Sequence, residues 1–83
     1  MSITLHLPDS VVNSLRLPEG EIETRLRTEL AIALYGQRIL SFGKASELAA
    51  IDRYQFGELL SQRGVARHYG PDELAEDVSY ARS

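Results

Sequence analysis

The sequence predicts a small, mainly α-helical protein with a short N-terminal β-strand, and three observations lead to that prediction. Apolar residues recur at helical spacing between Ile22 and Leu34, which indicates one long amphipathic helix. The stretch from Phe42 to Leu60 has the small residues, the capped turn and the second apolar face of a helix-turn-helix. Ahead of both, polar and apolar residues alternate from Ser2 to Leu7, which is typical of a strand with one buried face.

Length and composition indicate one domain that depends on a partner. A chain of 83 residues builds only a marginal core by itself, so we expect a homodimer. It has no cysteine, so we expect neither a disulfide nor a thiolate metal site. No signal segment and no apolar run of roughly 20 residues is present, so we expect a cytoplasmic protein without a membrane partner. Within the domain, residues 1–36 would serve dimerisation or as a scaffold, 37–64 form the helix-turn-helix and 65–83 form a partner-binding tail.

The apolar residues of the N-terminal strand are Ile3, Leu5 and Leu7. A lone strand of this length is unstable, so it must pair with another copy or with the sheet edge of a partner. A strand followed by helices is also the order of a ribbon-helix-helix repressor, which would place Ser2, Thr4 and His6 against the bases. None of these is the long basic or bidentate side chain that usually reads a base edge, so we favour a dimerisation or scaffold role.

Helix signals continue after Pro8. We expect Asp9 and Ser10 to cap a short helical turn, and the segment from Pro18 to Glu21 to open the longest helix with acidic residues near its positive end. Arg25 and Glu29 are four residues apart and should form a surface ion pair worth a few tenths of a kcal/mol. Gly36 should stop or bend this helix.

In the helix-turn-helix, the first helix runs from Lys44 to Ala50 with small residues on the side that a second helix crosses. The turn is Ala50 to Asp52, and Asp52 is a good N-cap with Gln55 placed for a capping box. The second helix should run from Arg53 to about Arg63 and stop at Gly64. Its expected buried face consists of Phe56, Leu59, Leu60 and the aliphatic stem of Arg63. Ala50 is the one mismatch, because this turn position favours glycine.

A nucleic-acid-binding face is predicted on the helix-turn-helix, where basic residues outnumber acidic ones although the whole chain has a net charge of -3. The candidate DNA-binding residues are Lys44, Arg53, Tyr54, Gln55 and Ser61. Arg53 and Tyr54, at the start of the second helix, could reach a base edge or a phosphate. Glu58 is repelled by phosphate and Gly57 offers no contact, so a helix-turn-helix that binds protein instead is the alternative.

No catalytic constellation is present in the sequence. His6 and His68 lie far apart and no thiol or glycine-framed serine accompanies them. The acidic residues Asp72, Glu73, Glu76 and Asp77 more often form a solvated helix face than a metal site. We therefore expect no enzyme, no cofactor and no metal, and a short acidic helix from Glu73 to about Val78.

Four blocks of residues resemble a known family: Ala31 to Tyr35, Leu40 to Ala49, Phe56 to Leu60 with Gly64 and Tyr69, and Asp72 to Asp77. They are similar to those of a family of small uncharacterised prokaryotic proteins that resembles the VapB-type antitoxins, and the likeness covers nearly the whole chain. Its most specific part is Ser41-Phe42-Gly43-Lys44-Ala45. The family pattern tends to have alanine and glycine at Ser46 and Ala50, and a bulkier residue at Gly57.

The resemblance implies an antitoxin encoded beside a PIN-domain-like ribonuclease toxin, which it binds and silences while its helix-turn-helix represses their shared promoter. Such a nuclease holds metal with carboxylates, so an inserted arginine would compete with metal and phosphate. The candidate toxin-binding residues are Arg67, Tyr69, Leu74, Val78, Tyr80 and Arg82. The alternatives are a stand-alone dimeric helix-turn-helix regulator and, less favoured, a protein-only adaptor.

Overall fold

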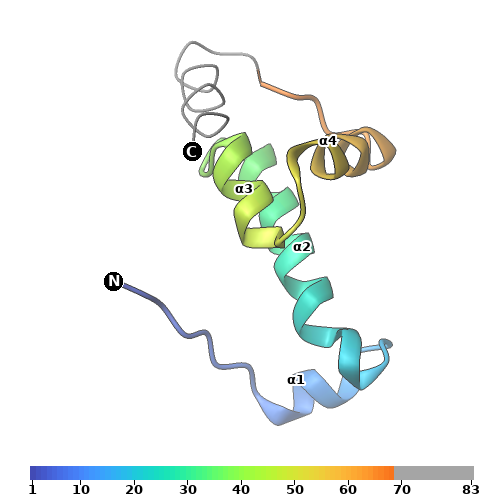
Figure 1. Ribbon diagram of the computed structural model, residues 1–83. Coiled ribbons are helices and arrows are strands. Elements are labelled where there is room, and N and C mark those ends of the chain that lie inside the picture. The colour runs from blue at the N-terminus through green and yellow to red at the C-terminus, as the bar shows by residue number, and fades with distance from the viewer. Residues whose placement is uncertain (69–83) are drawn as a thin grey trace.

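The computed structural model describes residues 1–68, and in this part of the chain every regular element is a helix (Figure 1). The mainly helical class is therefore confirmed. In chain order the elements are α1 (Asp9–Ser14), the 3₁₀ helix η1 (Glu19–Glu21), α2 (Ile22–Gly36), α3 (Phe42–Ala49) and α4 (Arg53–Gln62). None of these helices combines the length and the apolar character needed to cross a membrane.

The predicted N-terminal strand is wrong for the single chain. Residues 1–8 are assigned neither strand nor helix, and Ile3 and Leu5 are 82% and 72% exposed. A strand needs a neighbour for its backbone hydrogen bonds, and residues 9–68 form only helices and connections, so they supply none. The cap of the short helix is also different, because Pro8 precedes α1 and no side chain caps its first turn.

Helix α2 ends at Gly36, as predicted, but the left-handed residue that completes its end is Arg38, with φ 63°. The amide of Ile39 then donates to the carbonyl of Leu34 at 2.9 Å, which satisfies one of the last helical acceptors. The predicted ion pair along α2 is confirmed, with Arg25 Nε 3.1 Å from Glu29 Oε2.

The predicted turn between the two helices, the cap of the second helix and its stop are confirmed. Ala50 adopts φ 58° and ψ 36°, a left-handed conformation that costs a non-glycine residue about 1–2 kcal/mol. The Asp52 carboxylate accepts from the Gln55 amide at 2.7 Å, and the Gln55 side chain accepts from the Asp52 amide at 3.4 Å. Gly64, with φ 69°, follows the end of α4. Only the start of α3 differs, because the Ser41 hydroxyl caps it and helix begins at Phe42.

The core lies where α2, α3 and α4 meet. Its buried apolar residues are Ala31, Ile32, Tyr35, Phe42, Ala45, Ala49, Phe56 and Leu60. The rings of Tyr35, Phe42 and Phe56 meet edge to face, with centroids 5.4–6.1 Å apart. No residue from 1 to 30 is buried. We call residues 1–30 the N-terminal half and residues 31–68 the core half.

The expected buried face of α4 is confirmed for Phe56 and Leu60, which are fully buried. Leu59 is half-buried and packs against the core. The side chain of Arg63 is 35% exposed, because its guanidinium turns toward Glu29 of α2. The last predicted helix, from Glu73 to Val78, lies outside the described residues.

Candidate functional site

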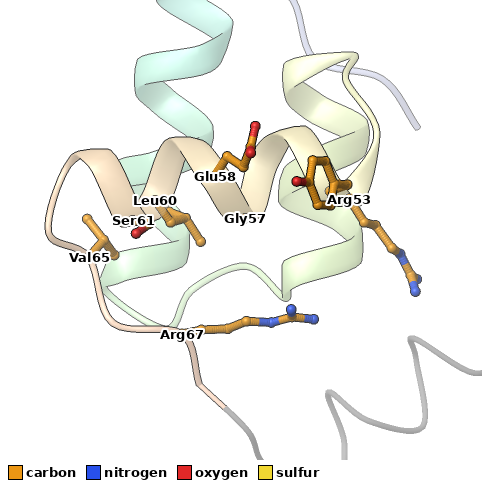
Figure 2. Close-up of a pocket in the computed structure, with 8 residues that line it drawn as sticks. Arg53, Gly57, Glu58, Leu60, Ser61, Val65 and Arg67 are labelled. Atoms are coloured by element: carbon orange, nitrogen blue, oxygen red, sulfur yellow. The ribbon is translucent and has the colours of Figure 1, made fainter.

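A groove of about 570 Å³ lies between the solvent-facing side of α4 and the chain that follows this helix (Figure 2). Helix α4 supplies most of the wall, and the segment after Gly64 supplies the rest. The groove is lined by Arg53, Tyr54, Gly57, Glu58, Leu60, Ser61, Val65 and Arg67. It is the candidate functional site because it joins the outward face of the second helix of the helix-turn-helix to the start of the tail.

The far wall of the groove is held in place by contacts with the core. The amide of Val65 donates to the carbonyl of Leu60 at 2.9 Å, which turns the chain back along α4. The Arg67 guanidinium carbon then lies 3.7 Å from the centroid of the Phe42 ring, a cation–π contact. Arg67 is therefore positioned by the buried aromatic cluster.

A second anchor follows immediately in the chain. The Tyr35 hydroxyl accepts a hydrogen bond from the His68 amide at 2.6 Å, and the two rings stack with centroids 4.8 Å apart. The sequence alone does not predict this contact, and it predicts no role for His68. The signal comes only with the structure, because Tyr35 is fully buried and a buried tyrosine hydroxyl usually finds a hydrogen-bond partner.

The groove gathers chemical groups that suit an anion. Arg53 occupies the first turn of α4, where the helix dipole also favours negative charge. In Figure 2 the side chains of Arg53 and Arg67 extend toward the same end of the groove, whereas Glu58 points away from them. Guanidinium groups form strong, directional hydrogen bonds with phosphate and carboxylate oxygens. The arrangement can therefore hold a phosphate or a carboxylate beside α4.

The predicted DNA-binding residues divide into two groups. Arg53, Tyr54 and Ser61 line the groove together, and Tyr54 is 75% exposed. Lys44 lies outside it on α3, with its Nζ 3.1 Å from Glu47 Oε2. Gln55 also lies outside the groove, because its side chain completes the cap of α4.

Of the predicted toxin-binding residues, Arg67 belongs to the same groove. The remaining ones lie outside the described residues: Tyr69, Leu74, Val78, Tyr80 and Arg82. Arg67 thus joins the two predicted sets, since it borders α4 and begins the tail.

A third arginine is directed elsewhere by an ion pair between α2 and α4. Arg63 donates to both carboxylate oxygens of Glu29, at 2.7 and 2.6 Å, and Arg25 adds a bond at 3.1 Å. The Arg63 hydrogen bonds, opposed by partial burial and assisted by Arg25, lower the pKa of Glu29 from 4.5 to about 2. The same pairing raises the pKa of Arg63. The sequence predicts only the pairing of Glu29 with Arg25, because no local pattern joins residues 34 positions apart.

Metal chemistry finds no support in the part of the chain that the structure describes. Within residues 1–68 no three His, Asp or Glu side chains gather closely enough to hold a metal ion. The chemistry of the groove is instead that of guanidinium and hydroxyl donors beside an exposed aromatic ring.

Comparison with known proteins places this chain among its relatives. All 83 residues match the family described as "Uncharacterised protein family (UPF0175)". The chain belongs to the UPF0175 family. A UPF0175 protein of Aeropyrum pernix is 44% identical over 72 residues, which cover 87% of this chain and 81% of the relative. A UPF0175 protein of Synechocystis is 37% identical over 83 residues, which cover 100% of this chain and 89% of the relative.

An Archaeoglobus fulgidus member of the UPF0175 family is 36% identical over 62 residues, which cover 75% of this chain and 71% of the relative. No solved structure matches the chain. The family description and the names of these relatives state no activity, so a function for this UPF0175 protein has to be argued from its helix-turn-helix and groove.

Proposed function

We propose that this UPF0175 protein is the antitoxin of a type II toxin-antitoxin pair. It binds and neutralises a PIN-domain-like ribonuclease toxin, and it represses its own operon through the helix-turn-helix. The observation that carries the DNA-binding part is the geometry of α3 and α4, joined by a left-handed residue and a capped turn, with Arg53, Tyr54 and Ser61 on one outward groove. The toxin-binding part rests on the resemblance to VapB-type antitoxins.

In the DNA-binding part, α4 is the helix that enters the major groove. Its first residues, Arg53 and Tyr54, are placed to reach base edges, as the N-terminal residues of a recognition helix do. Arg67 contacts a phosphate from the opposite wall of the groove. Glu58 also lines the groove and carries the same sign of charge as DNA, so it lowers the affinity of one copy for DNA. Binding is therefore weak for a single copy and depends on salt.

In the toxin-binding part, the tail follows the surface of the nuclease. A PIN-type nuclease holds its metal ion with carboxylates, and an arginine that reaches them competes with metal and substrate phosphate. Arg67 and Arg82 are the two arginines available for that role between residues 65 and 83. The Arg67 guanidinium lies against the Phe42 ring in the isolated chain. Toxin binding would therefore either displace this side chain from the ring or use it in its present position.

The DNA-binding part is tested by titrating fluorescent upstream DNA with the full chain at low and moderate salt. We expect Arg53→Ala to weaken binding by about 10-fold and to reduce the salt slope by about one. Arg27→Ala is the matched control, because Arg27 is an exposed arginine of α2 far from the groove in sequence. Equal effects of the two variants would contradict a role for the groove.

The toxin-binding part is tested by co-expression with the product of the adjoining gene. We expect a stable complex and the loss of the ribonuclease activity that the neighbour shows alone. If the double variant Arg67→Ala, Arg82→Ala still inhibits fully, an arginine does not occupy the toxin active site.

A second candidate is a stand-alone dimeric helix-turn-helix regulator of transcription. The described helix-turn-helix favours it, because α3 and α4 are complete in one chain without a toxin. This candidate predicts operator binding with unchanged affinity when the adjoining gene product is added, and no complex between the two proteins.

A further inference from the structure

The N-terminal half of this protein has apolar side chains and no core to hold them. Met1, Ile3 and Leu5 are strongly exposed, and Val11 of α1 is 46% exposed. Figure 1 shows α1 at the far end of α2 from α3 and α4, with the N-terminal segment extending from α1. Ordering a residue costs about 1–2 kcal/mol of backbone entropy, which exposed side chains do not offset. Residues 1–30 therefore need a partner surface.

We propose that residues 1–7 pair in antiparallel orientation with the same residues of a second copy. The two segments form a two-stranded ribbon across a two-fold axis, and the ribbon lays its apolar face on α1 and the first half of α2. The interface is isologous, because both copies present the same patch. The inference is independent of the antitoxin proposal, since it concerns the protein alone.

The sequence of the segment is complementary to itself. Pairing centred on Thr4 places Ile3 of each copy opposite Leu5 of the other and uses every residue from 1 to 7. Directly opposite residues of an antiparallel pair point to the same face, so all odd-numbered side chains gather on one side. A slip of one residue would divide them between the two faces, which fixes the register.

Charge also favours a second copy of this chain as the occupant. No Asp, Glu, Lys or Arg lies between residues 1 and 8, so two copies of the segment can approach without repulsion between charged side chains. The other face of the ribbon presents Ser2, Thr4 and His6 to water. Half-buried apolar residues on or next to α1 and α2 are available for the apolar face to pack against, namely Val12, Leu15, Ile22 and Leu26.

The experiment is light scattering of the full chain over a dilution series, without DNA or any second protein. We expect twice the 9.3 kDa chain mass for the unmodified protein. Leu5→Lys should weaken the dimer at least about 100-fold, because each copy loses one buried leucine. Ser2→Lys is the matched control, since it adds the same charge to the same segment on the water-facing side, and it should leave the dimer intact.

Circular dichroism separates loss of the dimer from loss of the fold. Leu5→Lys should keep the helical signal of the core half, because no core residue belongs to the N-terminal segment. A monomer for the unmodified protein, or equal weakening by Leu5→Lys and Ser2→Lys, would overturn the proposal.

Cysteine variants test the register, since the chain has no cysteine of its own. Thr4→Cys should form an intermolecular disulfide on mild oxidation, because residue 4 faces its own copy across the axis. His6→Cys is the control, since two copies of residue 6 would lie about 13 Å apart along the ribbon. Equally fast cross-linking of both variants would contradict the ribbon.

Discussion

The two halves of this protein differ in how they obtain their order. The core half holds all the buried residues of the described chain, and three of its aromatic rings interlock at its centre. The N-terminal half contains no aromatic residue and buries none of its aliphatic side chains. Large rings bury enough surface for a short sequence to close a core within one chain, whereas the exposed aliphatic side chains of the N-terminal half form no such core.

Local signals show the same difference. The Ser41 hydroxyl caps α3 and the Asp52 carboxylate caps α4, each through a hydrogen bond to a backbone amide. Neither α1 nor α2 has a side-chain cap at its N-terminus. The core half is therefore specified by its own sequence at each helix start, while the N-terminal half depends on contacts made elsewhere.

The largest expected effect contrasts a core residue with an exposed one. Phe56→Ala removes a fully buried ring that contacts Tyr35 and Phe42, so it should lower the free energy of unfolding by about 3–5 kcal/mol. Leu30→Ala, at a 42% exposed position of α2, should lower it by less than about 1 kcal/mol. Urea unfolding followed by circular dichroism measures both. Similar losses would mean that the two halves share one core.

A smaller effect contrasts the two aspartates at helix starts. Asp52→Ala removes the carboxylate that accepts from the Gln55 amide, and it should lower the free energy of unfolding by about 1 kcal/mol. Asp9→Ala should change it by only a few tenths, because Asp9 makes no capping hydrogen bond. The same urea titration decides between them, and a larger loss at Asp9 would contradict the difference in local order.

The smallest effect concerns the ion pair that joins α2 to α4. The pKa of Glu29 is lowered to about 2, so its carboxylate stabilises the folded state above the ordinary value of 4.5, and this contribution is lost as pH falls through 2. Glu29→Gln should therefore be less stable than the unmodified protein at neutral pH, and most of this difference should be gone near pH 2. Unfolding measured across this range checks the prediction.

The control for that ion pair is Glu23→Gln. Glu23 pairs with Arg27 at 3.8 Å on a strongly exposed face, so its removal should change stability little at any pH. A difference between Glu29→Gln and the unmodified protein that persisted unchanged at pH 2 would exclude the carboxylate as its source.

Features that depend on neighbouring residues could be predicted from the sequence. The turn at Ala50, the cap at Asp52, the stop at Gly64 and the pair of Arg25 with Glu29 all follow from spacings of a few residues. Helical periodicity likewise placed Arg53, Tyr54 and Ser61 on one face of α4, where they line the groove.

Contacts between distant residues could not be predicted in this way. Nothing local brings Arg63 to Glu29, Arg67 to Phe42 or His68 to Tyr35. Gln55 shows that one side chain can fit two predictions. The sequence predicts it both in the cap of α4 and in contact with DNA, and the structure places its side chain in the cap. The alternation at residues 3–7 predicts a strand, and this prediction is wrong for the single chain because residues 9–68 offer no strand to pair with it.

Hydrogen exchange of backbone amides in the full chain, measured over a dilution series, tests the contrast between the halves most directly. We predict that amides between residues 31 and 60 stay protected at every concentration, because the core closes within one chain. Amides between residues 2 and 7 should be protected only at concentrations where the dimer forms. Protection of residues 2–7 that does not change with concentration, or that never arises, would contradict the account.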